Sequence, residues 1–334
     1  MSYKKIFSIC TALFVCNFAN AATIYDNGIS ALNINMLTQN LMQYAHRGES
    51  MSQNFRRKNI YGTMTRLDEY GDDGSTLKTS PINSSKNSTL FSDVWIDFTH
   101  INTRGHYNHA NISERDRFYL ATIGGDIQNI NTKYGDILFG GFINYITGDA
   151  SSIDKNGNSL GLYARYEYSD FDATVLINNG SINNDSNIDD FTNAWFNVAV
   201  DASWKFHIDK TLYFQPQIYV GYNWVSSDSL YINSDTISSK NFAFFNIAPG
   251  AKFIKNIIDN WYGALSVKYM ATFGDEKDIY VNDLNAAKIA IDNYTQIDMN
   301  IEYDYKQFVF GAGISKQFGG FDGWIGNINA KYLF

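Results

Sequence analysis

The sequence predicts an all-β fold, a transmembrane antiparallel up-and-down barrel of about 12 strands. Three observations support this prediction. Apolar and polar residues alternate repeatedly over the C-terminal two thirds of the chain, aromatic residues make up 16% of it, and no apolar run after the N-terminus approaches the roughly 20 residues that a membrane helix needs. The hydrophobic share of 45% argues against disorder, and the formal net charge of −8 argues against a nucleic-acid-binding surface.

The N-terminus has the features of a secretory signal peptide. Two lysines precede the apolar stretch 6–18, and Ala19-Asn20-Ala21 fits the small-x-small cleavage pattern. We therefore expect residues 1–21 to be removed by cleavage after Ala21. Both cysteines of the chain lie in this leader, so the mature chain would depend on its core or its strand ladder rather than on disulfides.

Residues 22–92 are predicted to be a short helical and linker segment. Apolar residues recur at spacings of three and four within 31–58, which favours a helix. The stretch from residue 71 onward is rich in Gly, Ser, Asp and Asn, as flexible linkers are. The candidate lumen helix carries the cations Arg47, Arg56, Arg57 and Lys58. A cationic helix suits a barrel interior that contains acids.

Residues 93–334 hold the predicted strands. In the clearest one, 212–224, large apolar residues occupy every second position, opposite a face that contains Gln215, Gln217 and Asn223. Since side chains of a strand point alternately to its two faces, this pattern gives one apolar and one polar face. The segments 196–206, 294–303 and 324–334 repeat it.

The connections between these strands are predicted to alternate in length. Long ones, rich in Asn, Asp, Ser and Gly, are expected near 103–115, 148–158, 179–190, 226–240 and 273–290. Short ones are expected near 129–134, 169–170, 207–210, 254–260 and 304–306. Such alternation is typical of outer-membrane barrels, whose turns on one side are short and whose loops on the other are long.

Several charged residues fall on the polar face of the predicted strands. The lumen-facing candidates are Asp97, Arg165, Glu167, Asp172, Asp201, Lys205, Lys252, Lys268, Asp298 and Glu302. A soluble core would bury these charges at high cost, whereas a wet lumen would not, so a soluble β-sandwich or lipocalin-like barrel is the weaker alternative. Tryptophans near strand ends are expected to form interfacial girdles: Trp95, Trp204, Trp224, Trp261 and Trp324.

Motifs in this order and spacing connect the chain to a known family. They are Val94-Trp95-Ile96, Gly124-Gly125-Asp126, Gly140-Gly141, the proline-containing stretch Leu212 to Gln217, and the terminal Tyr332-Leu333-Phe334. From Asp93 to Phe334 the layout resembles the autotransporter translocator domain of type V secretion. Tyr332 and Phe334 resemble the family's barrel-assembly signal, although Asn329 stands where that signal usually has glycine.

The resemblance implies a twelve-stranded barrel in the outer membrane of a Gram-negative bacterium. Its upstream segment would run as a helix through the lumen, and its role would be to carry or anchor an N-terminal segment across the membrane. Only residues 22–92 lie between the leader and the barrel, and they contain no repeats. The segment is therefore a lumen plug, a short exported cargo or a vestigial passenger, or the chain is a truncated autotransporter.

The expected partners follow from this setting: outer-membrane lipid and lipopolysaccharide, the barrel-assembly machinery and periplasmic chaperones. We expect a monomer that binds no nucleic acid, no cofactor and no metal. We also expect that it is not an enzyme, because no catalytic or phosphate-binding motif is present. Two alternatives remain open. The barrel would be a passive porin, or a surface adhesin that uses its long external loops.

Overall fold

The computed structural model describes most of the chain from Asp93 to its end. The described residues are 93–107, 112–132, 134–150, 153–186, 190–226, 229–232, 235–239, 241–258, 260–274, 277–289 and 292–334. The predictions for the leader 1–21, the segment 31–58 and the linker that follows it lie outside these residues.

Twelve long strands form one antiparallel sheet. They are β1 (Asp93–Tyr107), β2 (Ile112–Thr132), β3 (Gly135–Ala150), β4 (Ile153–Tyr168), β5 (Phe171–Ser186), β6 (Phe191–Trp204), β8 (Leu212–Val225), β11 (Phe242–Ile258), β12 (Trp261–Gly274), β15 (Tyr294–Tyr305), β16 (Phe308–Gly319) and β17 (Phe321–Leu333). The two-residue strand β7 (Phe206–His207) pairs with β8.

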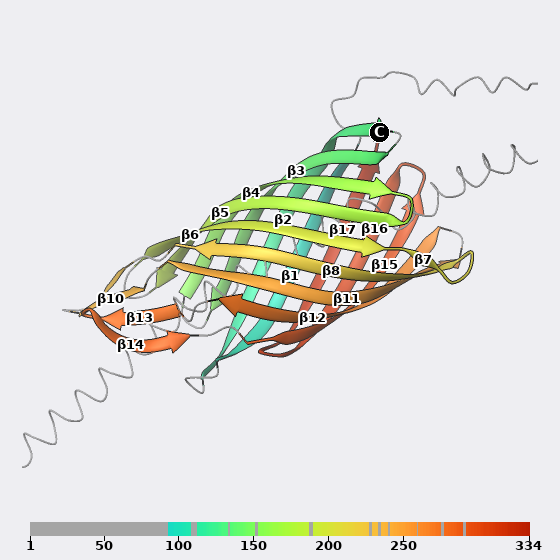
Figure 1. Cartoon of the computed structure of the whole chain (residues 1–334). Coiled ribbons are helices and arrows are strands. Elements are labelled where there is room, and N and C mark those ends of the chain that lie inside the picture. The colour runs from blue at the N-terminus through green and yellow to red at the C-terminus, as the bar shows by residue number, and fades with distance from the viewer. Residues whose placement is uncertain are drawn as a thin grey trace, which may run out of the picture.

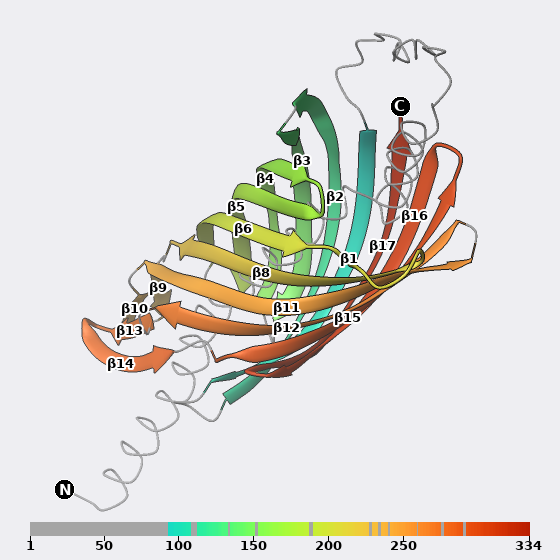
Figure 2. The ribbon, with the colours of Figure 1, turned by 45° about the vertical axis from the view of Figure 1, so that its right-hand side comes forward.

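The sheet closes on itself as a barrel. Neighbours in the sequence pair in turn, and the last strand β17 pairs with the first strand β1 from Asp93 opposite Leu333 to Gly105 opposite Phe321. Figure 2 shows these two strands side by side, and Figure 1 shows the tilt of the strands around the wall. The prediction of an antiparallel barrel with twelve strands is confirmed.

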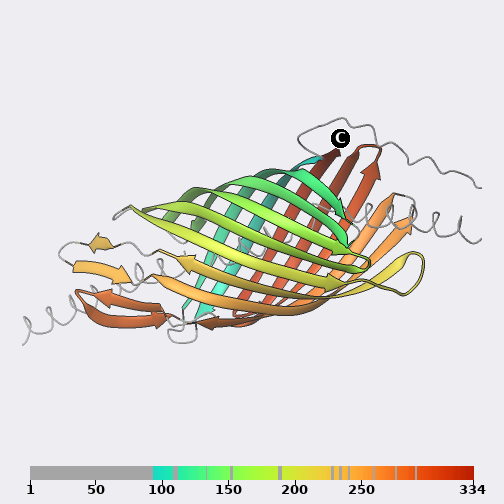
Figure 3. The same ribbon diagram turned by 45° about the horizontal axis from the view of Figure 1, so that its top comes forward.

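The two ends of the barrel differ. We call one the turn end: it holds the start of β1, the C-terminus and tight turns at which Ser169, Asn260 and Lys306 adopt positive φ. We call the other the loop end. There the strands β9 (Leu230–Ile232), β10 (Asp235–Ser239), β13 (Lys277–Val281) and β14 (Leu284–Ile289) form a separate four-stranded sheet beyond the barrel (Figures 1 and 3).

Burial alternates along the strands with the predicted phase. On β8 the polar side chains of Gln215 and Asn223 are buried, while Ile218 and Val220 on the other face are exposed. On β15 Gln296 and Asp298 are buried, while Met299 is 59% exposed. The outward face of the wall is therefore apolar and the inward face carries most of the polar groups.

Three of the long connections expected from the sequence are mostly strand. β1 extends to Tyr107, β4 begins at Ile153 directly after 151–152, and β5 extends to Ser186. Asn, Asp, Ser and Gly are depleted in ordinary strands, so their abundance there suggested loops. Here the backbone ladder continues through them; on β4, for example, the burial pattern alternates from the first residue. The other two long connections contain the four strands of the separate sheet.

Trp95 does not belong to an outward girdle, in contrast to the prediction. It is 6% exposed, and its indole N–H donates to the Tyr163 hydroxyl at 3.4 Å. The space for its ring comes from Gly124, where a Cβ would lie 2.3 Å from Trp95 Cζ2. Gly140 makes room for Tyr163 in the same way, with a Cβ 2.2 Å from Cζ. Trp204, Trp261 and Trp324 do face outward.

Candidate functional site

The inward face of the barrel wall is the candidate site, because it collects the charged and polar side chains. Asp97, Asp172, Asp201 and Asp298 are at most 3% exposed, and Arg165, Lys205 and Glu302 are also buried. Glu167, Lys252 and Lys268 are half-buried. Most of these ten residues lie between the turn end and the middle of their strands, and six of them are acidic.

Four of these charges form a cluster near the turn end. Lys205 Nζ lies 3.3 Å from Glu167 Oε1 and 3.7 Å from Asp172 Oδ2, and Arg165 Nη2 lies 3.9 Å from the same Asp172 oxygen. Ser203 donates to Asp172 Oδ1 at 2.7 Å. The cluster contains two acids and two cations, and each acid lies within 4 Å of both cations, so the charges balance.

A second charged group lies at the β1–β17 seam and was not predicted. Lys331 of β17 forms an ion pair with Asp93 of β1, and its Nζ lies 3.6 Å from Asp126 Oδ2 of β2. The Asp126 backbone N–H donates to Asp93 Oδ1 at 3.0 Å, and the Tyr163 hydroxyl donates to Asp126 Oδ1 at 2.5 Å. Alternation alone placed Lys331 on the inward face, but the pairing depends on which strands become neighbours at closure.

Two further predicted acids, Asp298 and Asp97, have polar partners on their own strand or on an adjacent one. Ser266 donates to Asp298 Oδ2 at 2.7 Å, and Gln296 donates to Asp298 Oδ1 at 2.6 Å. Asn327 of β17 donates to Asp97 Oδ2 at 3.2 Å.

The other predicted charges are placed by their register. Lys268 lies opposite Gln296, and Lys252 lies opposite Gln215 on one side and Ser266 on the other. Asp201 lies opposite Thr174, and Glu302 lies opposite Tyr262.

An uncharged ladder of amides crosses four strands further toward the loop end. Asn197 donates to Asn223 at 2.9 Å, Asn223 donates to Asn246 at 2.8 Å, and Asn246 donates to Thr272 at 2.9 Å. Asn223 and Asn246 each donate one of these bonds and accept another, so neighbouring strands are joined without any charge. On β2, β3 and β4 the bonds from Thr122 to Asn144 and from Asn144 to Ser159 serve the same purpose.

The loop-end half of the interior also contains a large apolar cluster that sequence reasoning missed. We call it the apolar collar; its members include Ile101, Phe118, Ile146, Ile182, Trp195, Val225, Phe244, Tyr294 and Phe321. Trp195 is fully buried. The interior is therefore partly zoned. The ten predicted charges lie mostly toward the turn end, together with a small apolar cluster of Tyr213, Ile254, Tyr262 and Ala264, whereas the larger apolar cluster extends to the loop end. The buried Asp116 and Lys155 are charged exceptions in the apolar zone.

The C-terminal aromatics lie in a cluster at the turn end. The Tyr332 ring lies 5.0 Å from those of Phe308 and Phe334, and its hydroxyl donates to Gln307 at 3.3 Å. Phe334 is 61% exposed. Elsewhere at the turn end, in the turn after β7, the Thr211 backbone N–H and hydroxyl donate to Asp209 and hold the pKa of that carboxyl below its usual value.

Among the described residues, no group of three or more His, Cys, Asp or Glu is arranged to hold a metal ion. The same part of the chain contains no helix with the length and hydropathy of a membrane span. The candidate lumen cations Arg47, Arg56, Arg57 and Lys58 lie outside it.

Comparison with known proteins shows which family the barrel resembles. The family model described as Autotransporter beta-domain matches residues 94–326. No curated protein matches the chain. Among solved structures, the transport unit of the autotransporter AIDA-I from Escherichia coli is 15% identical, with a TM-score of 0.62, over 82% of this chain and 97% of that chain.

Two further solved structures are similar. The beta domain of the Bordetella autotransporter BrkA is 12% identical, with a TM-score of 0.59, over 73% of this chain and 100% of that one. The translocator domain of the autotransporter NalP from Neisseria meningitidis is 10% identical, with a TM-score of 0.53, over 85% of this chain and 98% of that one. At these identities the likeness concerns the fold.

Proposed function

Since the chain belongs to the autotransporter beta-domain family and its barrel is an outer-membrane translocator, we propose that residues 31–58 occupy the lumen and that the segment before them is carried to the cell surface. In such barrels the short turns face the periplasm and the long loops face outward. The turn end is then periplasmic, and Asp93, where β1 begins, lies on the periplasmic side.

The zoning of the interior is the observation that carries this proposal. Along 31–58 the residues up to Met42 are mostly apolar or uncharged, and the cations Arg47, Arg56, Arg57 and Lys58 follow. A chain that enters from the turn end would set these cations beside the charged zone, where acids outnumber bases among the predicted residues. Its apolar half would lie against the apolar collar.

The length of the segment also fits. A helix over residues 31–58 would be about 42 Å long at 1.5 Å per residue. A bilayer with its headgroups is about 40–45 Å thick. One helix would therefore cross the whole barrel and leave residues 22–30 outside the cell.

The two alternative functions, a passive porin and an adhesin, would depend on different parts of the barrel. A passive porin would keep an open lumen, which a collar of buried aromatics narrows. An adhesin would act through the loop end, where the four-stranded sheet extends beyond the barrel. The collar favours an occupied lumen over an open one, so translocation remains the first proposal.

The partners follow from the setting. The exposed apolar outward face contacts membrane lipid. We further propose contact with lipopolysaccharide, insertion by the barrel-assembly machinery through the Tyr332 and Phe334 end, periplasmic chaperones before insertion, and a monomeric barrel. The family is one of translocators, and we expect this chain to have no catalytic activity.

An epitope tag placed after Ala22 tests the proposal. On intact cells, antibody should bind this tag, because the segment before the lumen helix is exported. The matched control is the same tag in the turn at 208–211, on the periplasmic side, which antibody should reach only after the outer membrane is permeabilised. If the tag after Ala22 also required permeabilisation, the segment would be periplasmic and the proposal would be wrong.

A further inference from the structure

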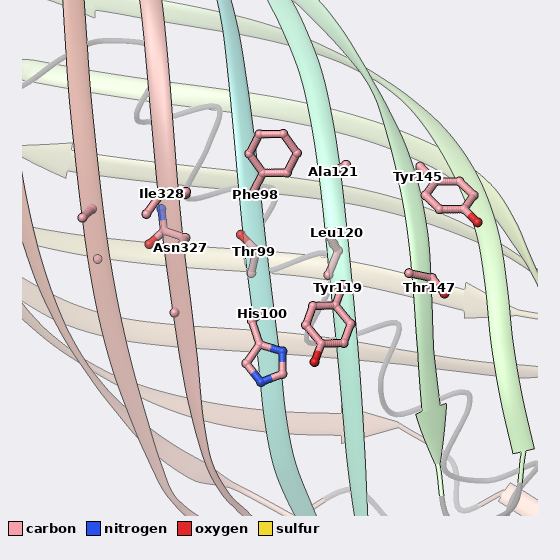
Figure 4. A pocket seen from close by; sticks show the side chains of 13 residues that line it. Phe98, Thr99, His100, Tyr119, Leu120, Ala121, Tyr145, Thr147, Asn327 and Ile328 are labelled. Atoms are coloured by element: carbon pink, nitrogen blue, oxygen red, sulfur yellow. The ribbon is translucent and has the colours of Figure 1, made fainter.

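A groove lies on the outward face of the barrel at the seam between the last and first strands (Figure 4). Its volume is about 590 Å³, and it crosses β16, β17, β1, β2 and β3. Small residues form its floor, and exposed large side chains form its walls. The floor includes Ala312 and Gly326, and the walls include Phe98, Tyr119, Tyr145 and Ile328.

The small residues explain why the surface is hollow there. A Cβ built on Gly326 meets no atom within 4 Å. By register Gly326 lies opposite His100, which lies opposite Tyr119, so the gap separates β16 from a stacked His100–Tyr119 pair with ring centroids 4.6 Å apart. The groove is therefore an apolar slot on the outward face of the barrel, where lipid chains lie.

Cations line the wall directly beyond the groove, toward the loop end. The next outward-facing row on these strands runs Lys316, Trp324, Asn102 and Arg117 by register. In the row after it, Arg104 lies directly opposite Arg115. The first of these two rows crosses three strand spacings of about 4.8 Å, so Lys316 and Arg117 at its ends are about 14 Å apart.

This cationic patch, which we define as Arg104, Arg115, Arg117 and Lys316, is only partly neutralised. Arg117 pairs with Asp149 at 2.7 Å, and Lys316 pairs with Asp322, which lies opposite Arg104. Among the side chains that the structure describes, neither Arg104 nor Arg115 forms an ion pair. Like charges directly opposite on neighbouring strands destabilise a sheet unless an anion lies between them. In a chain with a net charge of −8, such a pair needs an explanation.

We propose that the groove and the cationic patch together bind one lipopolysaccharide molecule of the outer leaflet. An acyl chain fills the slot over Gly326, and a phosphate of the sugar headgroup is held by Arg104 and Arg115. Guanidinium groups suit this role because they bind phosphate oxygens through two parallel hydrogen bonds. The patch and the groove follow the order of headgroup and acyl chain in the outer leaflet. The loop end faces that leaflet, and the cationic patch lies nearer the loop end than the apolar groove does.

The proposed contact with lipopolysaccharide is thereby located at the groove and the cationic patch. This site does not depend on what occupies the lumen. Failure of the lumen proposal would therefore leave it intact. A phospholipid of the inner leaflet cannot satisfy it, because the patch is at the opposite side of the membrane. The closing of β1 against β17 creates the site, so it exists only in the finished barrel.

The binding can be measured as the amount of lipopolysaccharide that copurifies with the full chain in mild detergent. Two variants remove different halves of the site. The double variant Arg104→Gln/Arg115→Gln removes the two arginine charges, and Gly326→Leu puts a side chain into the slot at a position where a Cβ meets no atom within 4 Å. Loss of each arginine should weaken retention roughly fivefold. Gly326→Leu should also retain less lipopolysaccharide than the wild type, although its charge is unchanged.

Matched controls lie elsewhere on the outward face. Lys255→Gln removes an exposed cation near the turn end, and Ala271→Leu enlarges a small residue of β12; both should keep wild-type retention. Resistance of each unheated barrel to denaturing electrophoresis shows that the variant is folded. Added phosphatidylglycerol vesicles and inorganic phosphate should not displace the bound molecule.

Two results would overturn the proposal. Wild-type retention by Gly326→Leu would show that no acyl chain occupies the slot. Displacement by phosphatidylglycerol as effective as displacement by purified lipopolysaccharide would show an ordinary anionic lipid at the surface, not a specific site.

Discussion

Deletion of residues 22–75 should convert a poorly conducting barrel into an open channel with several-fold higher single-channel conductance. A helix with its side chains is about 10–12 Å across, so we expect one helix to take up much of the space inside a twelve-stranded barrel whose inner face carries the apolar collar. Its removal leaves water between the charged groups of the wall, and ions can then pass.

Planar-bilayer recording of the full chain and of the deletion variant provides the comparison. Deletion of residues 22–30 alone is the control, because it leaves 31–58 in place and should leave the conductance low. Equal conductance of the full chain and the 22–75 deletion would show that the segment is not in the lumen. The barrel would then behave as a passive porin.

Replacing Lys331 by methionine should destabilise the barrel at its seam. Lys331 pairs with Asp93 and faces Asp126 at 3.6 Å, and all three residues are at most 5% exposed. Removal of the cation leaves two buried carboxylates beside each other, and breaking such a buried pair costs about 3–5 kcal/mol. The double variant Lys331→Met/Asp93→Asn should recover part of this loss because one of the two acids is gone.

Urea titration of the folded barrel, followed by electrophoretic mobility without heating, measures the change. Lys306→Met, in an exposed turn at the same end, is the control and should be neutral within the range of surface substitutions. If Lys331→Met had the same urea midpoint as the wild type, the seam would not depend on this ion pair.

Much of the barrel could be predicted from the sequence because its faces follow a period of two. The phase of β8 follows from Leu212 to Trp224 alone, and the inward positions of Asp97, Asp172 and Asp298 follow from local alternation. The same pattern could not give strand ends. Asn- and Ser-rich ends such as that of β5, which extends to Ser186, are poor strand formers by composition and become strands because neighbouring strands hydrogen-bond to them.

Contacts between strands that are far apart in the sequence could not be predicted from any local pattern. The Asp97–Asn327 bond joins residues 230 positions apart, and the Lys331 pair depends on the closing of β17 on β1. Trp95 was assigned to the outside because it lies near a strand end, but Gly124 on the neighbouring strand makes space for it inside. The apolar collar was missed for a related reason, since its members are scattered singly over most of the strands.

Cross-linking between the N-terminal segment and the wall would show directly whether residues 31–58 lie inside the barrel. In a chain with Cys10 and Cys16 replaced by serine, Arg56→Cys would be combined with Ser203→Cys, which is 5% exposed on the inward face, or with its neighbour Ala202→Cys on the outward face. With a short thiol-reactive cross-linker in intact outer membranes, we expect an efficient link to position 203 and little or none to position 202. Equal linking at both positions, or none at 203, would contradict the placement of residues 31–58 inside the barrel.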